Sequence, residues 1–172
     1  MMKLLGAMLI LLSGTLFGFY KAQQYSRRPK QMADVIRGLQ RLETEIVYGA
    51  TPLPEALMHV STSCAPPVQQ LFRFAAEELG RAGGRSVQFI WRQAIAVHWK
   101  HTAMRSVEQD MLSQLGFTLG LSDSADQVKH IRLAVQQLQG EIERAQEERK
   151  QYEGMWRSLG LLIGALVVIL MY

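Results

Sequence analysis

Hydrophobic residues gather in two uninterrupted runs at the ends of the chain, and the charged residues lie between them. The first run covers residues 4–20 and the second covers residues 158–172, and neither contains Asp, Glu, Lys or Arg. All 15 acidic residues and 18 of the 19 basic ones fall between the runs. A 17-residue helix covers roughly 25 Å, close to the thickness of a bilayer core. The pattern predicts an N-terminal transmembrane anchor over 1–21, a polar domain over 22–154 and a C-terminal anchor over 155–172.

Each run also allows a second interpretation. A cleaved signal peptide would explain the first run, but Tyr20 and Lys21 stand where cleavage requires small residues. The second run has only 15 residues, so a full span needs Arg157 to reach back to the interface, or Met155 and Trp156 to lie within it. A helix lying in the interface is less consistent with this run, because it has no polar face.

The basic residues near the two runs predict the orientation of the chain. Lys3 alone precedes the first run, whereas several cations follow it, and no basic residue follows the second run. By the positive-inside rule, the middle domain should be cytoplasmic. Cations just inside the first anchor should contact anionic lipid headgroups, and these are Lys21, Arg27, Arg28 and Lys30.

Both predicted anchors contain two glycines four residues apart, which lets helices approach each other closely. The pairs are Gly14 with Gly18 and Gly160 with Gly164. Specific helix packing through these pairs is one interpretation, but composition alone explains the spacing somewhat better, because glycine is common in membrane helices.

The middle domain shows helical periodicity throughout. The first helix should end at Gly49 after about five turns, and its core face is given by apolar residues three and four positions apart. They are Met32, Val35, Ile36, Leu39, Leu42, Ile46 and Val47.

Capping residues predict where the following helices begin and end. Thr51 should cap a short helix that ends near Val60, and two prolines open a third that ends at Gly80. Ser86 should cap the fourth helix, and a fifth runs over 103–115. The last helix starts after Ser122 or Ser124 and continues into the second apolar run. No segment alternates like a strand, so the expected fold is all-α: an antiparallel bundle of five to six helices with a transmembrane helix at each end.

Candidate chemistry is sparse. The net charge is only +4, which gives no reason to expect nucleic acid. Cys64, the single cysteine, excludes an internal disulfide and should be a small buried residue. His98 and His101 share a helix face but lack further metal ligands, so both should be solvated. The glycine-rich loop over 80–86 lacks the features of a nucleotide-binding loop. We expect no catalytic set, metal, cofactor or small-molecule substrate.

One segment carries basic residues without acidic ones. It could bind anionic headgroups, an acidic protein or, least readily, nucleic acid, and scattered solvated positions explain it as well. The candidate basic patch consists of Arg81, Arg85, Arg92, Lys100 and Arg105.

Three stretches resemble the stage III sporulation protein AB family. They are MKLLGAMLILLSGTLFGFY at 2–20, RRPKQ at 27–31 and LQRLETEIVYGATPLPEAL at 39–57, and the last is the specific one. That family is similar in turn to the inner-membrane platform protein of type II secretion and type IV pilus machines, whose helical repeat resembles the stretch from Gly49 to Leu57. A weaker second element lies at 84–91. This chain departs from the platform proteins by having one such domain and two anchors instead of a duplicated domain and three spans.

The resemblance implies a non-enzymatic component of the channel between mother cell and forespore in endospore-forming bacteria. Its partners would be membrane lipids and other channel proteins, including a secretion-type ATPase in the mother-cell cytoplasm. The alternative is an extracytoplasmic structural linker with inverted topology.

The turn between the first two helices is the candidate site for docking a partner. It offers carboxylates and two prolines held in a short segment. The equally weighted alternative is that the turn packs into the core. The candidate residues are Glu45, Tyr48, Pro52, Leu53 and Glu55.

Overall fold

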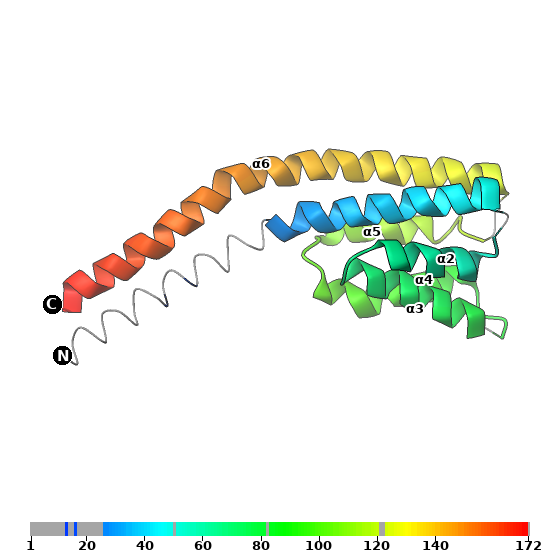
Figure 1. Cartoon of the computed structure of the whole chain (residues 1–172), viewed down its shortest axis with the longest axis horizontal. Coiled ribbons are helices and arrows are strands. Elements are labelled where there is room, and N and C mark those ends of the chain that lie inside the picture. Colours follow the sequence, from blue (N-terminus) through cyan, green and yellow to red (C-terminus); the bar gives the residue numbers. More distant parts are fainter. Residues whose placement is uncertain are drawn as a thin grey trace. The chain divides into compact units, whose positions relative to one another are not determined.

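The computed structural model describes residues 26–49, 51–81, 83–120 and 123–171, together with the single positions 13 and 16. Beyond Tyr152, it describes side chains only at residues 154, 155, 158 and 162. Every regular element in these ranges is a helix (Figure 1), which confirms the all-α prediction.

Six α-helices and two short helical turns make up this part of the chain. A helix over 26–44 continues into a π-helix, η1 (Glu45–Gly49). The others are α2 (Leu53–Ser63), α3 (Val68–Arg81), α4 (Val87–His98), the 3₁₀-helix η2 (Trp99–His101), α5 (Ser106–Leu115) and α6 (Ser124–Met171).

The chain divides into two compact units. Residues 1–29 and 143–172 form unit 1, and residues 30–142 form unit 2. The boundaries at 21 and 155 that the sequence indicates for the anchors stay a prediction.

The core of unit 2 follows the predicted stripe on the first helix, except at its end. Met32, Leu39 and Leu42 are fully buried, and Val35 and Ile36 are nearly so. The last two predicted positions are wrong: residue 46 is half-buried and residue 47 is 46% exposed. The π-helix explains the change, because its wider turn shifts the side chains off the α-helical face.

Trp91 joins three helices in the centre of unit 2. It is 1% exposed, and its indole Nε1 donates a 2.6 Å hydrogen bond to the carbonyl of Leu112. The Phe72 ring lies 5.8 Å from it, centroid to centroid. A Cβ atom at Gly116 would stand 2.5 Å from Trp91 Cδ1, so the indole occupies the space that this glycine leaves. The tryptophan thereby ties α3, α4 and α5 together.

The helix starts confirm one predicted cap and correct two. The Ser86 hydroxyl accepts a 3.3 Å hydrogen bond from the Phe89 amide, as predicted for α4. Thr51 is not the cap of α2, which begins after Pro52 without a side-chain cap. For α6 the cap is Asp123, whose carboxylate accepts from the Asp126 amide at 2.8 Å.

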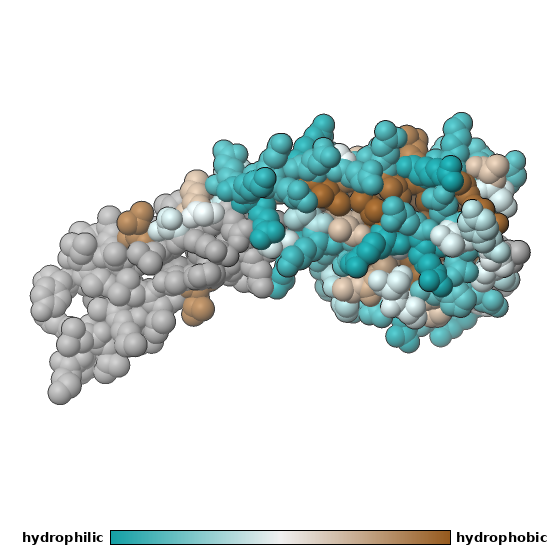
Figure 2. Space-filling model, turned by 45° about the horizontal axis from the view of Figure 1, so that its top comes forward, coloured by the Kyte–Doolittle hydropathy of each residue, from teal (hydrophilic) through white to brown (hydrophobic). Residues whose placement is uncertain are grey.

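Unit 2 has a mostly hydrophilic surface. Figure 2 shows one face, on which a band of hydrophobic side chains lies between two hydrophilic rows.

The membrane anchors stay predictions. Among the described residues, no helix has both the length and the apolar sequence that crossing a membrane requires. Apart from positions 13 and 16, the anchor predicted over 1–21 lies outside these residues, and so do Gly14 and Gly18. Gly160 and Gly164 belong to α6, but their surroundings lie outside the described part of the chain.

Candidate functional site

The carboxylate of Glu45 joins the end of the first helix to α2. It accepts a 2.9 Å hydrogen bond from the Thr51 hydroxyl and a 3.1 Å one from Arg41 Nε, and it lies 3.3 Å from His59 Nδ1. The Glu45 side chain is only 12% exposed. The hydrogen bond from Thr51, with those from Arg41 and His59, holds the pKa of Glu45 below its usual range. Glu45 is therefore a structural link between two helices.

Gly49 makes this link possible. A Cβ atom at this position would lie 2.6 Å from the Thr51 hydroxyl oxygen and 2.9 Å from a Glu45 carboxylate oxygen. Any side chain there would push apart the two groups that hydrogen-bond to each other. Gly49 and Thr51 thus fix the turn, because side-chain atoms occupy the space that a Cβ atom at Gly49 would need.

The turn presents three of the five candidate docking residues to solvent. Tyr48 is 84% exposed, and Pro52 and Glu55 are also exposed. Leu53 is half-buried and lies close to Gly120, whose added Cβ would be 3.5 Å from it. The prediction of a docking carboxylate at Glu45 is wrong, because its oxygens serve the fold.

The alternative prediction, that this turn packs into the core, is therefore wrong for Tyr48 and Pro52. Docking of a partner to the exposed residues stays a prediction. We call Tyr48, Pro52 and Glu55 the exposed tip.

The candidate basic patch does not form one surface. Arg81 and Arg85 lie 3.8 Å and 2.9 Å from the carboxylate of Glu78, an acidic residue that lies just before the segment. Lys100 and Arg105 follow α4, whose 12 residues span about 18 Å, and both are exposed. Arg92 is exposed on α4 itself.

The predicted lipid contacts also separate. Within unit 1, Arg28 is 6% exposed and its guanidinium lies 3.2 Å from the carboxylate of Glu148. A buried, ion-paired arginine is unavailable to a lipid headgroup, so this assignment is corrected. Arg27 and Lys30 are exposed, whereas Lys21 lies outside the described residues.

His98 is not solvated as predicted. Its ring packs edge-on against Phe74 with centroids 5.2 Å apart, and no hydrogen bond reaches its Nε2 in the described part of the chain. Burial lowers its pKa, and nearby His101 and Lys100 lower it further. His101 is exposed as expected. In the described ranges, no three His, Cys, Asp or Glu side chains are grouped so that they could hold a metal ion.

Cys64 is buried, as predicted, at 7% exposure. Its thiol lies 3.5 Å from the carbonyl oxygen of Asp34, and burial raises its pKa to about 11. The thiol is therefore protonated at neutral pH and is a poor nucleophile.

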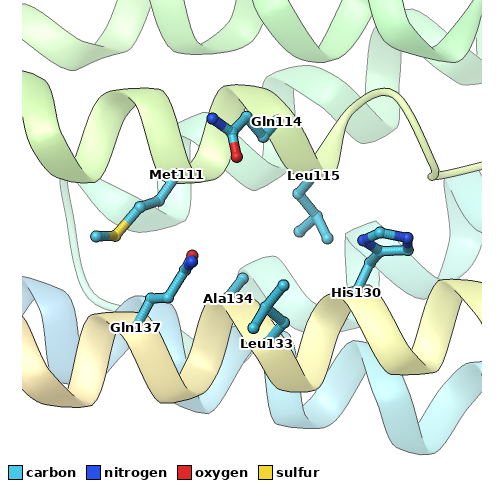
Figure 3. Close-up of a pocket in the computed structure, with 7 residues that line it drawn as sticks. All are labelled: Met111, Gln114, Leu115, His130, Leu133, Ala134 and Gln137. Carbon is cyan, nitrogen blue, oxygen red and sulfur yellow. The ribbon is translucent and has the colours of Figure 1, made fainter.

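The sequence analysis missed a small hollow between α5 and α6. Figure 3 shows side chains of the two helices facing one another across it. It holds about 40 Å³ and opens to solvent, which is far below the roughly 300–1,000 Å³ of small-molecule sites. The lining residues are Met111, Gln114, Leu115, His130, Leu133, Ala134 and Gln137.

Leu133 is the residue whose position in the sequence could have indicated this hollow. This apolar residue lies off the buried face of α6, which Val128, Ile131, Val135 and Leu138 form, and it is 49% exposed. His130 is the one ionisable side chain in this lining, and its Nε2 lies 3.6 Å from Asp126. The hollow therefore offers no pair of groups for acid–base or nucleophilic chemistry.

Comparison with known proteins identifies the family. The family model described as stage III sporulation protein AB matches residues 3–172. The chain belongs to the stage III sporulation protein AB family. A stage III sporulation protein AB from Bacillus subtilis (strain 168) is 37% identical over 171 residues, which cover 99% of each chain.

A solved structure of stage III sporulation protein AB supports the same fold. It is 34% identical in sequence and superimposes with a TM-score of 0.68, covering 73% of this chain and 98% of the solved chain. Members of the stage III sporulation protein AB family are sporulation proteins and not enzymes, as the sequence predicted for this chain.

Proposed function

We propose that this protein is a membrane-anchored component of the channel between mother cell and forespore, where its helical domain is a platform for partner proteins. One partner is a secretion-type ATPase in the mother-cell cytoplasm. The protein itself catalyses no reaction and organises others at the membrane.

The exposed tip is the observation that carries this proposal. Tyr48 is 84% exposed, yet the turn that bears it is held by the Glu45 contacts and by the close packing around Gly49. A rigid turn loses little conformational entropy when it binds, and exposed tyrosines are frequent binding hot spots. This combination is typical of a docking residue.

Two features of the sequence support anchoring and orientation. The apolar runs at 4–20 and 158–172 are each long enough, or nearly so, to span a bilayer. Basic residues lie on the inner side of both runs, which favours a helical domain on the cytoplasmic side of the membrane. In this proposal the membrane is the mother-cell membrane that faces the forespore.

The docking part is tested by Tyr48→Ala in the full chain. We expect the ATPase to co-purify about thirtyfold less from solubilised membranes, since truncation of a hot-spot tyrosine costs about 2 kcal/mol or more. The melting temperature should not change, because the side chain is exposed. Phe89→Ala is the matched control, as Phe89 is a 56% exposed aromatic residue on α4. Equal co-purification by the Tyr48 variant and the parent would refute docking at the tip.

The topology is tested by labelling Gly83→Cys with a membrane-impermeant thiol reagent. Gly83 is exposed and nothing lies within 4 Å of an added Cβ, whereas Gly84 has a φ of +100° that disfavours a side chain. Cys64 can stay in place, because it is buried and has a raised pKa. Labelling only after lysis supports a cytoplasmic domain. Labelling in intact cells would instead favour the extracytoplasmic linker.

A further inference from the structure

The chain enters and leaves unit 2 at the same end. The unit begins at Lys30 and ends at Ile142. Inside it, the helix over 26–44 and α6 run side by side in opposite directions (Figure 1), and Arg132 donates a 2.8 Å hydrogen bond to Glu43. Ten helical residues cover about 15 Å, so Ile142 lies level with about residue 33. We call this end of unit 2 the proximal end.

The loop between α4 and α5 is fixed at the proximal end. The side-chain oxygen of Gln31 accepts a 2.6 Å hydrogen bond from the backbone amide of Ala103. The amide and hydroxyl of Thr102 donate to the carbonyl of Trp99 at 2.9 Å and 2.7 Å. These bonds hold the segment over 99–105 beside the start of the first helix.

The proximal end exposes cations and hides carboxylates. Three cationic side chains there are exposed: Lys30, Lys100 and Arg105. Three acidic residues at this end are 8%, 0% and 8% exposed: Asp34, Glu108 and Glu141. The first exposed carboxylate along α5 is Asp110, one turn beyond its start. Among the residues of unit 2 at the proximal end, the charged side chains that meet solvent are therefore cationic.

The opposite end of α4 also carries two arginines. Arg81 and Arg85 share the carboxylate of Glu78, and the length of α4, about 18 Å, separates them from the proximal end. They are the reference for cations at another place on the same unit.

We propose that the proximal end of unit 2 binds the anionic lipid headgroups of the membrane in which the chain is anchored. This inference rests on the proposed membrane anchoring, because tethering keeps the cations near the bilayer at high effective concentration. An anionic leaflet strengthens association about fivefold for each lysine or arginine close to it. The contact would fix the helical domain against the membrane and leave the exposed tip for partners.

The test uses the full chain with a fluorophore on Ser106→Cys, reconstituted into vesicles that contain lipids with a nitroxide on the headgroup. Ser106 is the first residue of α5 and is exposed. One vesicle set is phosphatidylcholine, and the other is an equal mixture with phosphatidylglycerol. We expect strong quenching only in the mixture, reversed by salt, and little quenching of a fluorophore on Gly83→Cys.

Matched double variants identify the cations. Lys30→Gln with Lys100→Gln should lower the ratio of lipid-bound to unbound domain about 25-fold, by the fivefold effect of each charge. Arg81→Gln with Arg85→Gln removes the same charge from the other end of α4 and should leave it unchanged. Equal quenching in both vesicle types, or equal losses in both double variants, would overturn the inference. Extraction of the chain by an alkaline wash would overturn the anchoring proposal as well, whereas a retained chain without quenching overturns this inference alone.

Discussion

The same substitution should have opposite effects at two glycines in helix interiors. Gly38 lies in the first helix, where an added Cβ would stand 2.9 Å from Phe72 Cε2, 3.1 Å from Cys64 Sγ and 3.1 Å from Val60 Cγ1. Gly140 lies in α6, and nothing comes within 4 Å of an added Cβ there. We predict that Gly38→Ala destabilises unit 2 and that Gly140→Ala stabilises it.

The magnitudes follow from two opposing terms. Alanine is more favourable than glycine in a helix interior by about 1 kcal/mol, and both variants gain this. At Gly38 the new methyl group must displace side chains that are themselves 1%, 7% and 0% exposed, and overpacking of this kind costs about 1–3 kcal/mol. The net free energy of unfolding should fall by up to about 2 kcal/mol for Gly38→Ala and rise by about 1 kcal/mol for Gly140→Ala.

Thermal unfolding of the purified full chain in detergent, followed by tryptophan fluorescence, measures the difference. For a unit of this size, each kcal/mol shifts the melting temperature by about 4 °C. The reasoning fails if Gly38→Ala melts at or above the parent temperature. In a Phe72→Leu background, which removes the closest contact, the penalty of Gly38→Ala should shrink. An undiminished penalty would mean that the closeness to Phe72 is not its cause.

Three further predictions concern titratable groups. Cys64 should react with thiol reagents only on unfolding at about pH 8, because its pKa is about 11; Gly83→Cys is the fast control, and equal rates would contradict burial. Glu45→Gln should lower the urea midpoint of unfolding at neutral pH. This loss of stability relative to the parent should vanish as pH falls through the lowered pKa of Glu45. The exposed Glu55→Gln is the control, and a loss of stability that does not depend on pH would contradict the charge argument. His98 has a lowered pKa, so the native state should lose stability as pH falls below about 6.5, and His98→Gln should flatten this dependence relative to the parent.

Local sequence patterns predicted what is determined locally. The stripe from Met32 to Leu42 is buried as its spacing indicated, because an amphipathic face has one direction in which to pack. Ser86 caps α4 as expected, since the cap and the amide that it accepts from are three residues apart. The π-helix at the end of the first helix was not predictable from periodicity, because the wider turn depends on the contacts of Glu45 with α2.

The misassigned charges share a different cause. Arg28 pairs with Glu148, 120 residues away along the chain, and Glu45 bonds to residues on the next helix. In the sequence, a charged residue looks available for binding whenever its ion-pair or hydrogen-bond partner lies on another helix. The sequence indicated the residues of the turn as a group, and their docking role stays a prediction, whereas their separate structural roles required the fold.

The roles of the residues within the turn are separated by what each residue contributes to the fold. Glu45, Gly49 and Thr51 hold the geometry, because their atoms contact one another. Tyr48 contributes little to folding, since a side chain that is 84% exposed buries almost no apolar area. Three residues already fix the turn, so this tyrosine is not needed to stabilise the fold. Its large aromatic side chain contributes binding free energy only when another surface covers it. The stability of the turn and the proposed binding by its tip should therefore be separable by mutation, which is the outcome that the proposed platform function requires.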